Sequence, residues 1–436
     1  MNCDWQDVRI LDLGRVVTGR TPPGNAPDYY GDEVPFLTPS DMGSVRKVDH
    51  TARSLSSFGA QQLGRCLVPH GVGVSCIGWQ MGKAVLIARP TITNQQINSV
   101  VINDEVADSL FVYYALRLRR SELFNFGSGG SRTPILNKRD FERLPFLLPP
   151  LHEQRAIASI LGAFDDKIEL NRRMNETLEE LGRTIFRSWF VDFDPVRAKA
   201  EGKKPEGMDD ETAALFPSRF VGAELGEIPE GWERLALAEA SAELQRGIGP
   251  KYVVEGGVLV LNQKCVRDHR VHFQLGRRHD AAKGRSVKGR ELQLGDVLVN
   301  STGVGTLGRV AQITHLPEPA IVDSHLTVVR ANQDSVLAIV LGVGLLQRES
   351  EIEALGEGST GQTELSRKRL GELPFVVPAM PIQKRFESAV GPTRDRMDLA
   401  ERESGTLAAL RDLLLPKLIS GELRIPEAEK HAEACL

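Results

Sequence analysis

The chain has 436 residues, enough for two or three domains that each bury their own hydrophobic core. Its net charge of −4 gives no support for a nucleic-acid partner, so only local clusters of basic residues can provide it. The five cysteines are scattered and no segment is an unbroken apolar span. These features exclude a disulfide framework and a membrane-spanning protein, and they predict a cytoplasmic one.

Residues 1–150 are expected to form a first mixed α/β domain, because short β-branched runs alternate with turns that contain glycine and proline. The runs at 72–76 and 84–88 flank a glycine-containing segment at 78–83, which predicts a hairpin or a turn. A further strand is expected at 97–102. The domain therefore reads as a small sheet with variable loops.

Residues 151–193 are predicted to form one long helix. Pro149 and Pro150 precede it, and apolar residues then recur at alternating steps of four and three, interrupted by Asn171 and Asn175. This spacing is typical of a coiled coil, whose narrow apolar seam packs on a partner helix. At about 1.5 Å per residue, the helix is on the order of 55 Å long. The expected seam residues are Ile157, Leu161, Ile168, Leu178, Leu181 and Ile185.

The second half of the sequence repeats the first. Glycine, Leu-Pro-Phe and glutamine positions recur at a constant offset: 356 − 127 = 229, 374 − 145 = 229 and 383 − 154 = 229. The same offset places a second long helix at 380–424, followed by a tail at 425–436. A tandem duplication predicts that the two helices bury their seams against each other. The seam residues expected in the second helix are Phe386, Val390, Met397, Leu407, Leu410 and Leu414.

Residues 194–227 are expected to be a linker, because they are charged, small and contain proline. A second mixed α/β domain is expected at 228–379. The second helix contains Pro392 and Pro416, and an internal proline costs roughly 3 kcal/mol in a straight helix, so a kink or break is expected near each. The predicted fold class is α+β, with two tandem mixed α/β domains separated and joined by two long antiparallel helices.

No motif indicates a catalytic centre. The segment Gly303-Val-Gly-Thr-Leu-Gly308 matches the dinucleotide fingerprint, but a strand-like run follows it, so we predict a hairpin turn. His269, His272 and His279 lie close together, yet no cysteine or carboxylate pattern completes a metal site. We therefore expect no catalytic, cofactor-binding or metal residues. A two-domain enzyme that binds a nucleotide at the glycine-rich turn stays open as an alternative.

A basic cluster at 264–290 is the strongest sign of a nucleic-acid partner, because clustered Lys and Arg release counterions when they contact phosphates. A solvated basic face is the alternative interpretation. The cluster contains Lys264, Arg267, Arg270, Arg277, Arg278, Lys283, Arg285, Lys288 and Arg290. The candidate DNA-binding residues, taken from this cluster, from other basic positions and from polar loop residues that can contact base edges, are Gln80, Lys83, Gln95, Arg132, Asn262, Gln263, Lys264, Arg267, Arg270 and Arg309.

The two helical regions resemble those of the DNA specificity subunit of type I restriction–modification systems. The resemblance is carried by Leu148-Pro-Pro-Leu-His-Glu-Gln-Arg-Ala-Ile, Asp165-Asp-Lys-Ile-Glu-Leu-Asn, Ser188-Trp-Phe-Val-Asp-Phe-Asp-Pro-Val-Arg-Ala-Lys and Leu414-Leu-Pro-Lys-Leu-Ile-Ser-Gly-Glu-Leu. It covers essentially the whole chain, but within the two domains it is only a resemblance of layout.

The resemblance implies two target-recognition domains, each contacting one half of a bipartite, asymmetric site in double-stranded DNA, with the helices setting the spacing. It also implies docking of two modification subunits, which use S-adenosylmethionine to methylate adenine, and of two restriction subunits, which use ATP and Mg. This chain would bind no cofactor and carry out no chemistry itself. A coiled-coil scaffold that does not bind DNA is a further alternative, which the basic cluster argues against.

Overall fold

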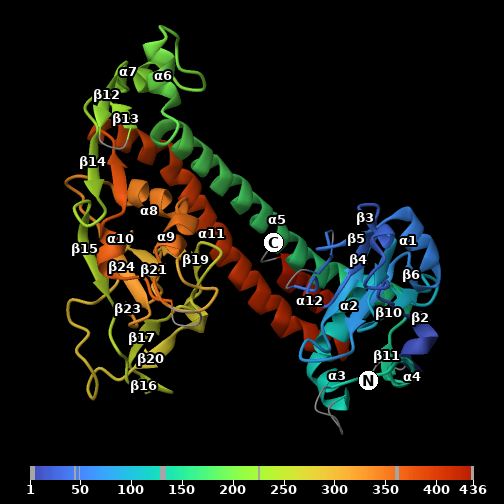
Figure 1. Ribbon diagram of the computed structural model, residues 1–436. Coiled ribbons are helices and arrows are strands. Elements are labelled where there is room, and N and C mark those ends of the chain that lie inside the picture. Colours follow the sequence, from blue (N-terminus) through green and yellow to red (C-terminus); the bar gives the residue numbers. More distant parts are fainter. Residues whose placement is uncertain are drawn as a thin grey trace. The chain divides into compact units, whose positions relative to one another are not determined.

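The computed structural model describes residues 5–43, 46–48, 50–127, 134–223, 226–358 and 363–433. The chain divides into two compact units, the first made of Met1–Asn171 with Arg402–Leu436 and the second of Arg172–Glu401. Each unit contains one mixed α/β domain and part of each long helix (Figure 1). Among the described residues, no helix is long and apolar enough to cross a membrane.

Domain 1 is built on a four-stranded antiparallel sheet with the strand order β2-β10-β7-β8. A second sheet, β3-β5-β4-β9-β6, contains one parallel pair, β4 with β9, and β1 pairs with β11. The strands are β1 (Gln6–Arg9), β2 (Gly14–Thr18), β3 (Tyr30–Gly31), β4 (Val34–Leu37), β5 (Ser54–Leu55), β6 (Leu67–Val68), β7 (Gly71–Ser75), β8 (Ala84–Ile87), β9 (Thr91–Thr93), β10 (Ile97–Ile102) and β11 (Pro145–Leu148). The helices are α1 (Ser57–Gln62), α2 (Ser109–Leu118), α3 (Arg120–Gly127) and α4 (Lys138–Glu142).

Domain 2 repeats this topology. Its main sheet has the order β15-β24-β21-β22, its second sheet has the order β16-β20-β17-β23 with β17 parallel to β23, and β14 pairs with β25. The strands are β14 (Glu233–Ala236), β15 (Ser241–Arg246), β16 (Tyr252–Val253), β17 (Val258–Leu261), β18 (Val266–Arg267), β19 (Arg270–Val271), β20 (Arg277–His279), β21 (Val297–Asn300), β22 (Val310–Gln312), β23 (Ala320–Val322), β24 (Leu326–Ala331) and β25 (Pro374–Val377). The helices are α8 (Ala338–Leu346), α9 (Glu349–Ala354) and α10 (Arg367–Gly371).

A buried glutamine ties each long helix to its own domain and repeats the duplication at the level of single hydrogen bonds. In both copies the side-chain oxygen accepts one backbone N–H, and the side-chain nitrogen donates to two backbone carbonyls, over 2.7–3.2 Å. The first set is Gln154 with Asp108, Val106 and Pro149, and the second is Gln383 with Leu337, Ser335 and Pro378. The offset is constant, since 383 − 154, 337 − 108, 335 − 106 and 378 − 149 all equal 229. Buried backbone groups at each helix entrance are thereby satisfied.

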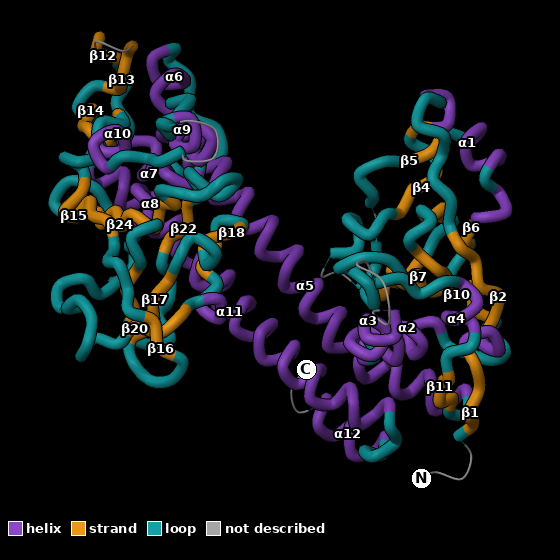
Figure 2. The backbone as a smooth tube through the Cα atoms, turned by 60° about the horizontal axis from the view of Figure 1, so that its bottom comes forward, coloured by secondary structure: helices purple, strands orange, loops and turns teal. Residues whose placement is uncertain are grey.

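The long helices are α5 (Leu151–Phe190) and α11 (Met380–Ile419), of 40 residues each. Figures 1 and 2 show the two helices side by side within each unit, one half of the pair in the first unit and the other half in the second. In the first unit Asp165 pairs with Arg411, and the Asn171 amide donates to Glu403 at 2.7 Å, so the two helices are antiparallel. Buried Asn171 therefore fixes the register of the pair, as a polar residue in a coiled-coil seam does.

Eleven of the twelve predicted seam residues are buried or half-buried, but the prediction for Leu181 is wrong, because its side chain is 48% exposed. The seam passes through Gly182 instead. This glycine is buried, and a Cβ atom added there would lie 3.3 Å from Val390 Cγ1. A pattern based on hydropathy selects Leu181 because glycine has no apolar side chain to contribute.

Of the kink or break expected near each proline of α11, the break is not found, because the helix continues across Pro392 and Pro416. A proline removes the hydrogen bond to the carbonyl four residues earlier, here that of Ser388 or Asp412. All four residues are exposed, so water can reach the two carbonyls that lose their helical donor. The cost of each proline is reduced by its place on the solvent side of the helix.

Residues 194–227, expected to be a linker, contain α6 (Asp194–Ala200), α7 (Asp210–Leu215), β12 (Phe220–Ala223) and the start of β13 (Gly226–Pro229). Arg385 of α11 holds this segment, since its Nε donates to the Thr212 hydroxyl at 2.6 Å and its Nη2 pairs with Asp209. The tail contains α12 (Ile425–Glu433), which buries Ala428 in the core of the first unit.

Candidate nucleic-acid interface

In each domain, the turn of a hairpin in the main sheet lies beside a loop that precedes another strand of that sheet. The hairpin is β7–β8 and the strand is β10 in domain 1, and they are β21–β22 and β24 in domain 2. In domain 1 the turn 76–83 joins β7 to β8, and the Cys76 N–H donates to the Gln96 carbonyl at 2.7 Å. In domain 2 the turn 301–309 joins β21 to β22, and the Ser301 N–H donates to the His325 carbonyl at 2.9 Å. We call the surface formed by this turn and loop the loop face: residues 76–83 and 94–96 in domain 1, and 301–309 and 323–325 in domain 2.

Three of the predicted DNA contacts lie on the loop face of domain 1. The Lys83 ammonium donates to Gln80 Oε1 and to the Met42 carbonyl, both at 3.0 Å, so a hydrogen bond joins two of the predicted contacts. Gln95 is exposed in the adjoining loop. The fourth candidate of this domain, Arg132, lies outside the described residues.

In domain 2 the structure gathers three predicted contacts at the glycine-rich turn. The Gln263 carbonyl accepts a hydrogen bond from the Asn300 side chain at 3.0 Å, at the base of the turn, and Lys264 follows as an exposed residue. Arg309 ends the turn and donates to the Gly305 carbonyl at 2.9 Å. The equivalent of Arg309 in domain 1 is Lys83, since each supplies the carbonyl that accepts the N–H at the end of the preceding strand.

Two predicted contacts are engaged within the protein instead. Arg270 is half-buried and forms ion pairs with Glu179, at 3.6 Å, and with Glu401, so its guanidinium is not available to a phosphate. Asn262 is buried, and its side-chain oxygen accepts the Lys264 N–H at 2.9 Å. The sequence shows the type and position of these side chains, but it does not show which groups of the same protein they bind.

Most of the basic cluster is exposed. Arg278 is an exception, because it forms a two-bond ion pair with Glu318 at 2.5 and 2.7 Å, and Arg277 lies over the Tyr252 ring at 3.5 Å. The exposed members are Lys264, Arg267, Arg277, Lys283, Arg285, Lys288 and Arg290. Within the described ranges, none of these seven pairs with a carboxylate, so their counterions can be released on contact with a polyanion.

Four residues near the loop face of domain 2 have no signal in the local sequence: Arg246, Thr302, His325 and Glu364. Arg246, at the end of β15, pairs with Glu364, and its carbonyl accepts a hydrogen bond from Arg290 at 2.9 Å. Thr302 and His325 share a hydrogen bond of 2.6 Å on the loop face. Four separate segments supply these side chains, so only the tertiary structure brings them together.

A second hairpin, β18–β19, docks within the second unit beside α5 and α11. Its two-residue turn, Asp268 and His269, has φ values of 50° and 57°, the conformation of a type I′ turn. Such turns favour Asn-Gly, so Asp-His gives no hairpin signal in the sequence. Holding non-glycine residues in this conformation costs energy, which the contacts of His269 offset.

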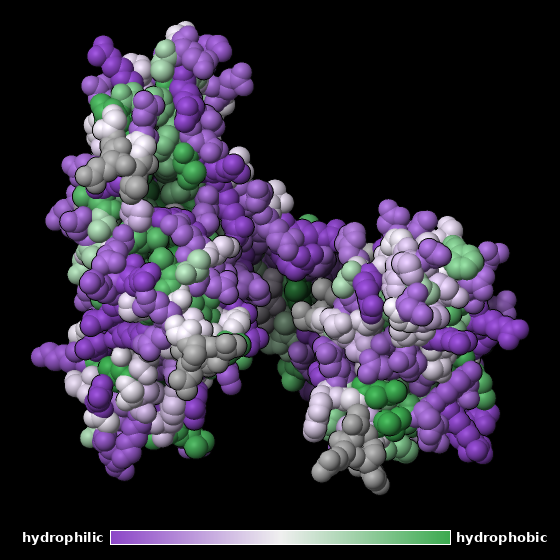
Figure 3. All heavy atoms as spheres, in the orientation of Figure 1, coloured by the Kyte–Doolittle hydropathy of each residue, from purple (hydrophilic) through white to green (hydrophobic). Residues whose placement is uncertain are grey.

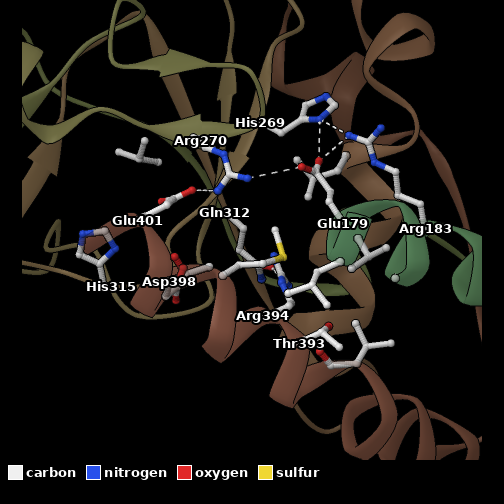
Figure 4. Close-up of a pocket in the computed structure, with 18 of the residues that line it drawn as sticks. Glu179, Arg183, His269, Arg270, Gln312, His315, Thr393, Arg394, Asp398 and Glu401 are labelled. Atoms are coloured by element: carbon white, nitrogen blue, oxygen red, sulfur yellow. Dashed lines mark hydrogen bonds and ion pairs between the residues drawn. The ribbon is translucent and has the colours of Figure 1, made fainter. Parts of the chain in front are cut away.

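His269 lies between carboxylates from α5 and α9, as Figure 4 shows in part. Its two ring nitrogens are each 3.4 Å from a carboxylate oxygen, one of Glu179 and one of Glu349. Hydrogen bonds to Glu179 and then to Glu349 raise the pKa of His269 to about 9, against burial and the nearby charge of Arg183. This pKa favours the imidazolium form of His269 at neutral pH, in an ionic network that also includes Arg183, whose Nη2 lies 2.5 Å from His269 Nδ1.

The network predicts a pH dependence of stability. Because the pKa of His269 is raised above its ordinary value of 6.5, its stabilising contribution is complete below pH 6.5 and is lost as the pH rises through about 9. We expect the free energy of unfolding to fall over this interval, and to fall less in His269→Gln. Denaturant titrations at several pH values measure the effect, and His272→Gln should retain the wild-type profile. An identical profile for His269→Gln would contradict this role.

A cavity of about 80 Å³ lies beside the hairpin in the second unit. Arg394 of α11 lines it and donates to Gln312 Oε1 at 2.5 Å, and burial lowers the pKa of Arg394 despite the nearby Asp398 (Figure 4). Pockets that hold drug-sized ligands measure roughly 300–1,000 Å³. This cavity therefore fits only a few water molecules and is too small for a nucleotide.

The glycine-rich segment 303–308 is the turn of an antiparallel hairpin, as the sequence predicts, and no helix N-terminus follows it to receive a phosphate. His279 is buried, where it accepts from the Lys251 N–H and contacts the Arg285 carbonyl, both at 2.9 Å. Over the described ranges, no three His, Cys, Asp or Glu side chains gather as ligands for a metal ion.

Comparisons with known proteins agree with one another. Residues 2–180 match the family model described as type I restriction modification DNA specificity domain. The type I restriction enzyme MjaIX specificity subunit of Methanocaldococcus jannaschii is 26% identical, over 97% of this chain and 94% of its own length. The HindI specificity subunit of Haemophilus influenzae is also 26% identical, over 63% of this chain and 68% of its own.

Among solved structures, the S subunit of a type I restriction–modification system from M. genitalium aligns with a TM-score of 0.58 and 16% identity. The alignment covers 96% of this chain and 97% of that one. At this identity the likeness shows the fold alone. The predicted fold class, two mixed α/β domains joined by long helices, is confirmed.

Proposed function

We propose that this chain, which belongs to the family of type I restriction–modification specificity subunits, recognises a bipartite DNA sequence with one domain for each half-site. The observation that carries the proposal is the duplicated scaffold with two chemically different loop faces. At positions that make the same backbone hydrogen bonds, domain 1 has Gln96 and domain 2 has His325. Equal scaffolds with unequal side chains suit a DNA site whose halves differ.

Rigid hairpins present the polar side chains of each loop face, which favours specific base contacts over loose association. The exposed part of the basic cluster would supply phosphate contacts, which orient a protein on DNA without reading its sequence. We therefore expect the DNA sequence to be recognised by hydrogen bonds at the loop faces. Phosphate contacts of Lys264, Arg267 and their exposed neighbours would contribute affinity.

The assembled complex would contain two modification and two restriction subunits in the cytoplasm. These partners would use S-adenosylmethionine, ATP and Mg, whereas this chain would bind no cofactor and act as a non-catalytic subunit. Exposed leucines on the long helices support docking of protein partners there, because large apolar side chains facing water often mark interaction surfaces. They are Leu170 and Leu181 of α5, and Leu399 and Leu413 of α11, which are 48–60% exposed.

Adenine-methylation mapping tests the function directly. DNA from cells that express the modification subunit with this chain is compared with DNA from cells that lack it. We expect a split motif that is methylated only when the chain is present, and its two halves identify both half-sites. A stable complex with the modification subunit that adds no methylation would overturn the proposal and favour the scaffold without DNA.

A further inference from the structure

Trp79 is the most exposed aromatic side chain reported for the described residues, at 79%. It lies at the tip of the β7–β8 turn on the loop face of domain 1, between Gly78 and Gly82, which both have a φ of +81°. The face of the molecule in Figure 3 is largely hydrophilic, with hydrophobic side chains in small separate patches. The exposed indole of Trp79 at the tip of this turn therefore indicates a binding role.

Two further apolar side chains lie close to this tryptophan. The Trp79 ring lies against Phe124 of helix α3, with the ring centroids 6.1 Å apart. Ile135 is 50% exposed and bridges to Ile77, next to the Gly78 N–H that donates to the Pro134 carbonyl. We call Trp79, Phe124 and Ile135 the aromatic patch.

The aromatic patch is continuous with residues suited to DNA. Gln80 and Lys83 belong to the same turn as Trp79 and are joined by a hydrogen bond of 3.0 Å. The backbone of exposed Arg120 lies against Gly82, where an added Cβ would be 2.6 Å from the Arg120 carbonyl oxygen. An indole bordered by an amide and two cations has the composition of surfaces that stack bases while holding the phosphate backbone.

The duplicate domain shows that the scaffold does not require this patch. The residue equivalent to Ile77 is Thr302, and the residue equivalent to Ile135 is Glu364, since 364 − 135 = 229 and both pairs form the same isolated bridge. The tip of the domain 2 turn carries Val304 instead of an aromatic residue. At these equivalent positions one fold thus presents aromatic and apolar side chains in domain 1, and a threonine, a glutamate and an exposed valine in domain 2.

We propose that Trp79 stacks on a base of the half-site bound by domain 1, inserting as a wedge at a base step. The partner is duplex DNA, and the inference rests on the function proposed above. An aromatic wedge gains contact with an unstacked base and kinks the duplex, so that more of the DNA contacts the protein surface. Domain 1 would therefore select a step that unstacks easily, a form of readout that domain 2 lacks.

The test uses the full chain with its modification subunit and a duplex carrying the motif found by methylation mapping. Trp79→Ala should weaken binding by about 5- to 150-fold, as loss of one base–aromatic stack does, and leave the salt dependence unchanged because no charge is removed. Trp79→Phe should recover most of the affinity. Phe58→Ala removes another exposed aromatic side chain outside the loop face and should bind as the wild type does.

Tryptophan fluorescence gives an independent readout. Trp189 and Trp232 are buried, and Trp5 is half-buried with its indole N–H donating to Glu153 at 3.0 Å, so quenching of this chain on DNA binding should come mainly from Trp79 and be lost in Trp79→Phe. Wild-type affinity and quenching in the Trp79 variants would overturn this inference while leaving the proposed function intact. Normal DNA binding by Trp79→Ala with loss of the modification subunit would overturn it in favour of a protein-docking patch. If the wild-type complex does not bind the duplex, the proposed function itself fails.

Discussion

Replacing Arg411 with alanine is expected to lower the free energy of unfolding by about 3–5 kcal/mol, the loss that follows when one partner of a buried ion pair is removed. In the first unit, Arg411 of α11 pairs with Asp165 of α5, and the two side chains are 10% and 9% exposed. The Tyr114 hydroxyl also donates to Asp165 at 2.6 Å, and burial and then the Asp165 charge raise the pKa of Tyr114. Without the guanidinium, a buried carboxylate would lose its closest counter-charge.

Denaturant unfolding of the full chain measures this loss, and the next residue of α5 provides the control. Asp166 pairs with Arg46, but its side chain is 68% exposed, so Asp166→Ala should cost no more than about 1 kcal/mol. Equal losses in Arg411→Ala and Asp166→Ala would show that burial of the pair does not determine its contribution. A loss confined to Arg411→Ala would identify this contact as a main link between the two helices in that unit.

Replacing Lys264 and Arg267 together with alanine is expected to weaken DNA binding by about 30-fold at 0.15 M salt. The estimate follows from a slope of about −0.9 in the logarithm of affinity against the logarithm of salt concentration for each phosphate contact. Both side chains are exposed, and Lys264 adjoins the loop face of domain 2. The slope itself should become shallower by about 1.8 for the two contacts.

Binding titrations at four or five salt concentrations give both quantities. Arg278→Ala is the matched control, because this arginine belongs to the same cluster but is already paired with Glu318. We expect its affinity and salt slope to stay close to those of the wild type. An unchanged slope in the Lys264/Arg267 double variant would place the phosphate contacts elsewhere on the chain.

The sequence was sufficient for the long helices and for the duplication. Both depend on patterns repeated over many residues, so errors at single positions do not alter the result. The starts of α5 and α11 agree with the predicted boundaries at 151 and 380. The sequence was less reliable where one residue decided the outcome: the seam runs through Gly182 rather than Leu181, and α11 continues without a break across its two exposed prolines.

Only the tertiary structure decided which charges and polar groups are available to a partner. Arg270 and Lys264 look alike in the sequence, but Arg270 meets Glu401 across more than a hundred residues of chain, whereas Lys264 faces water. The same holds for Arg246, Thr302 and His325, which separate segments bring to one surface. Hydropathy and turn signals arise from neighbours along the chain and can be read from it. Ion pairing and exposure depend on distances between distant segments, which are fixed only when the chain has folded.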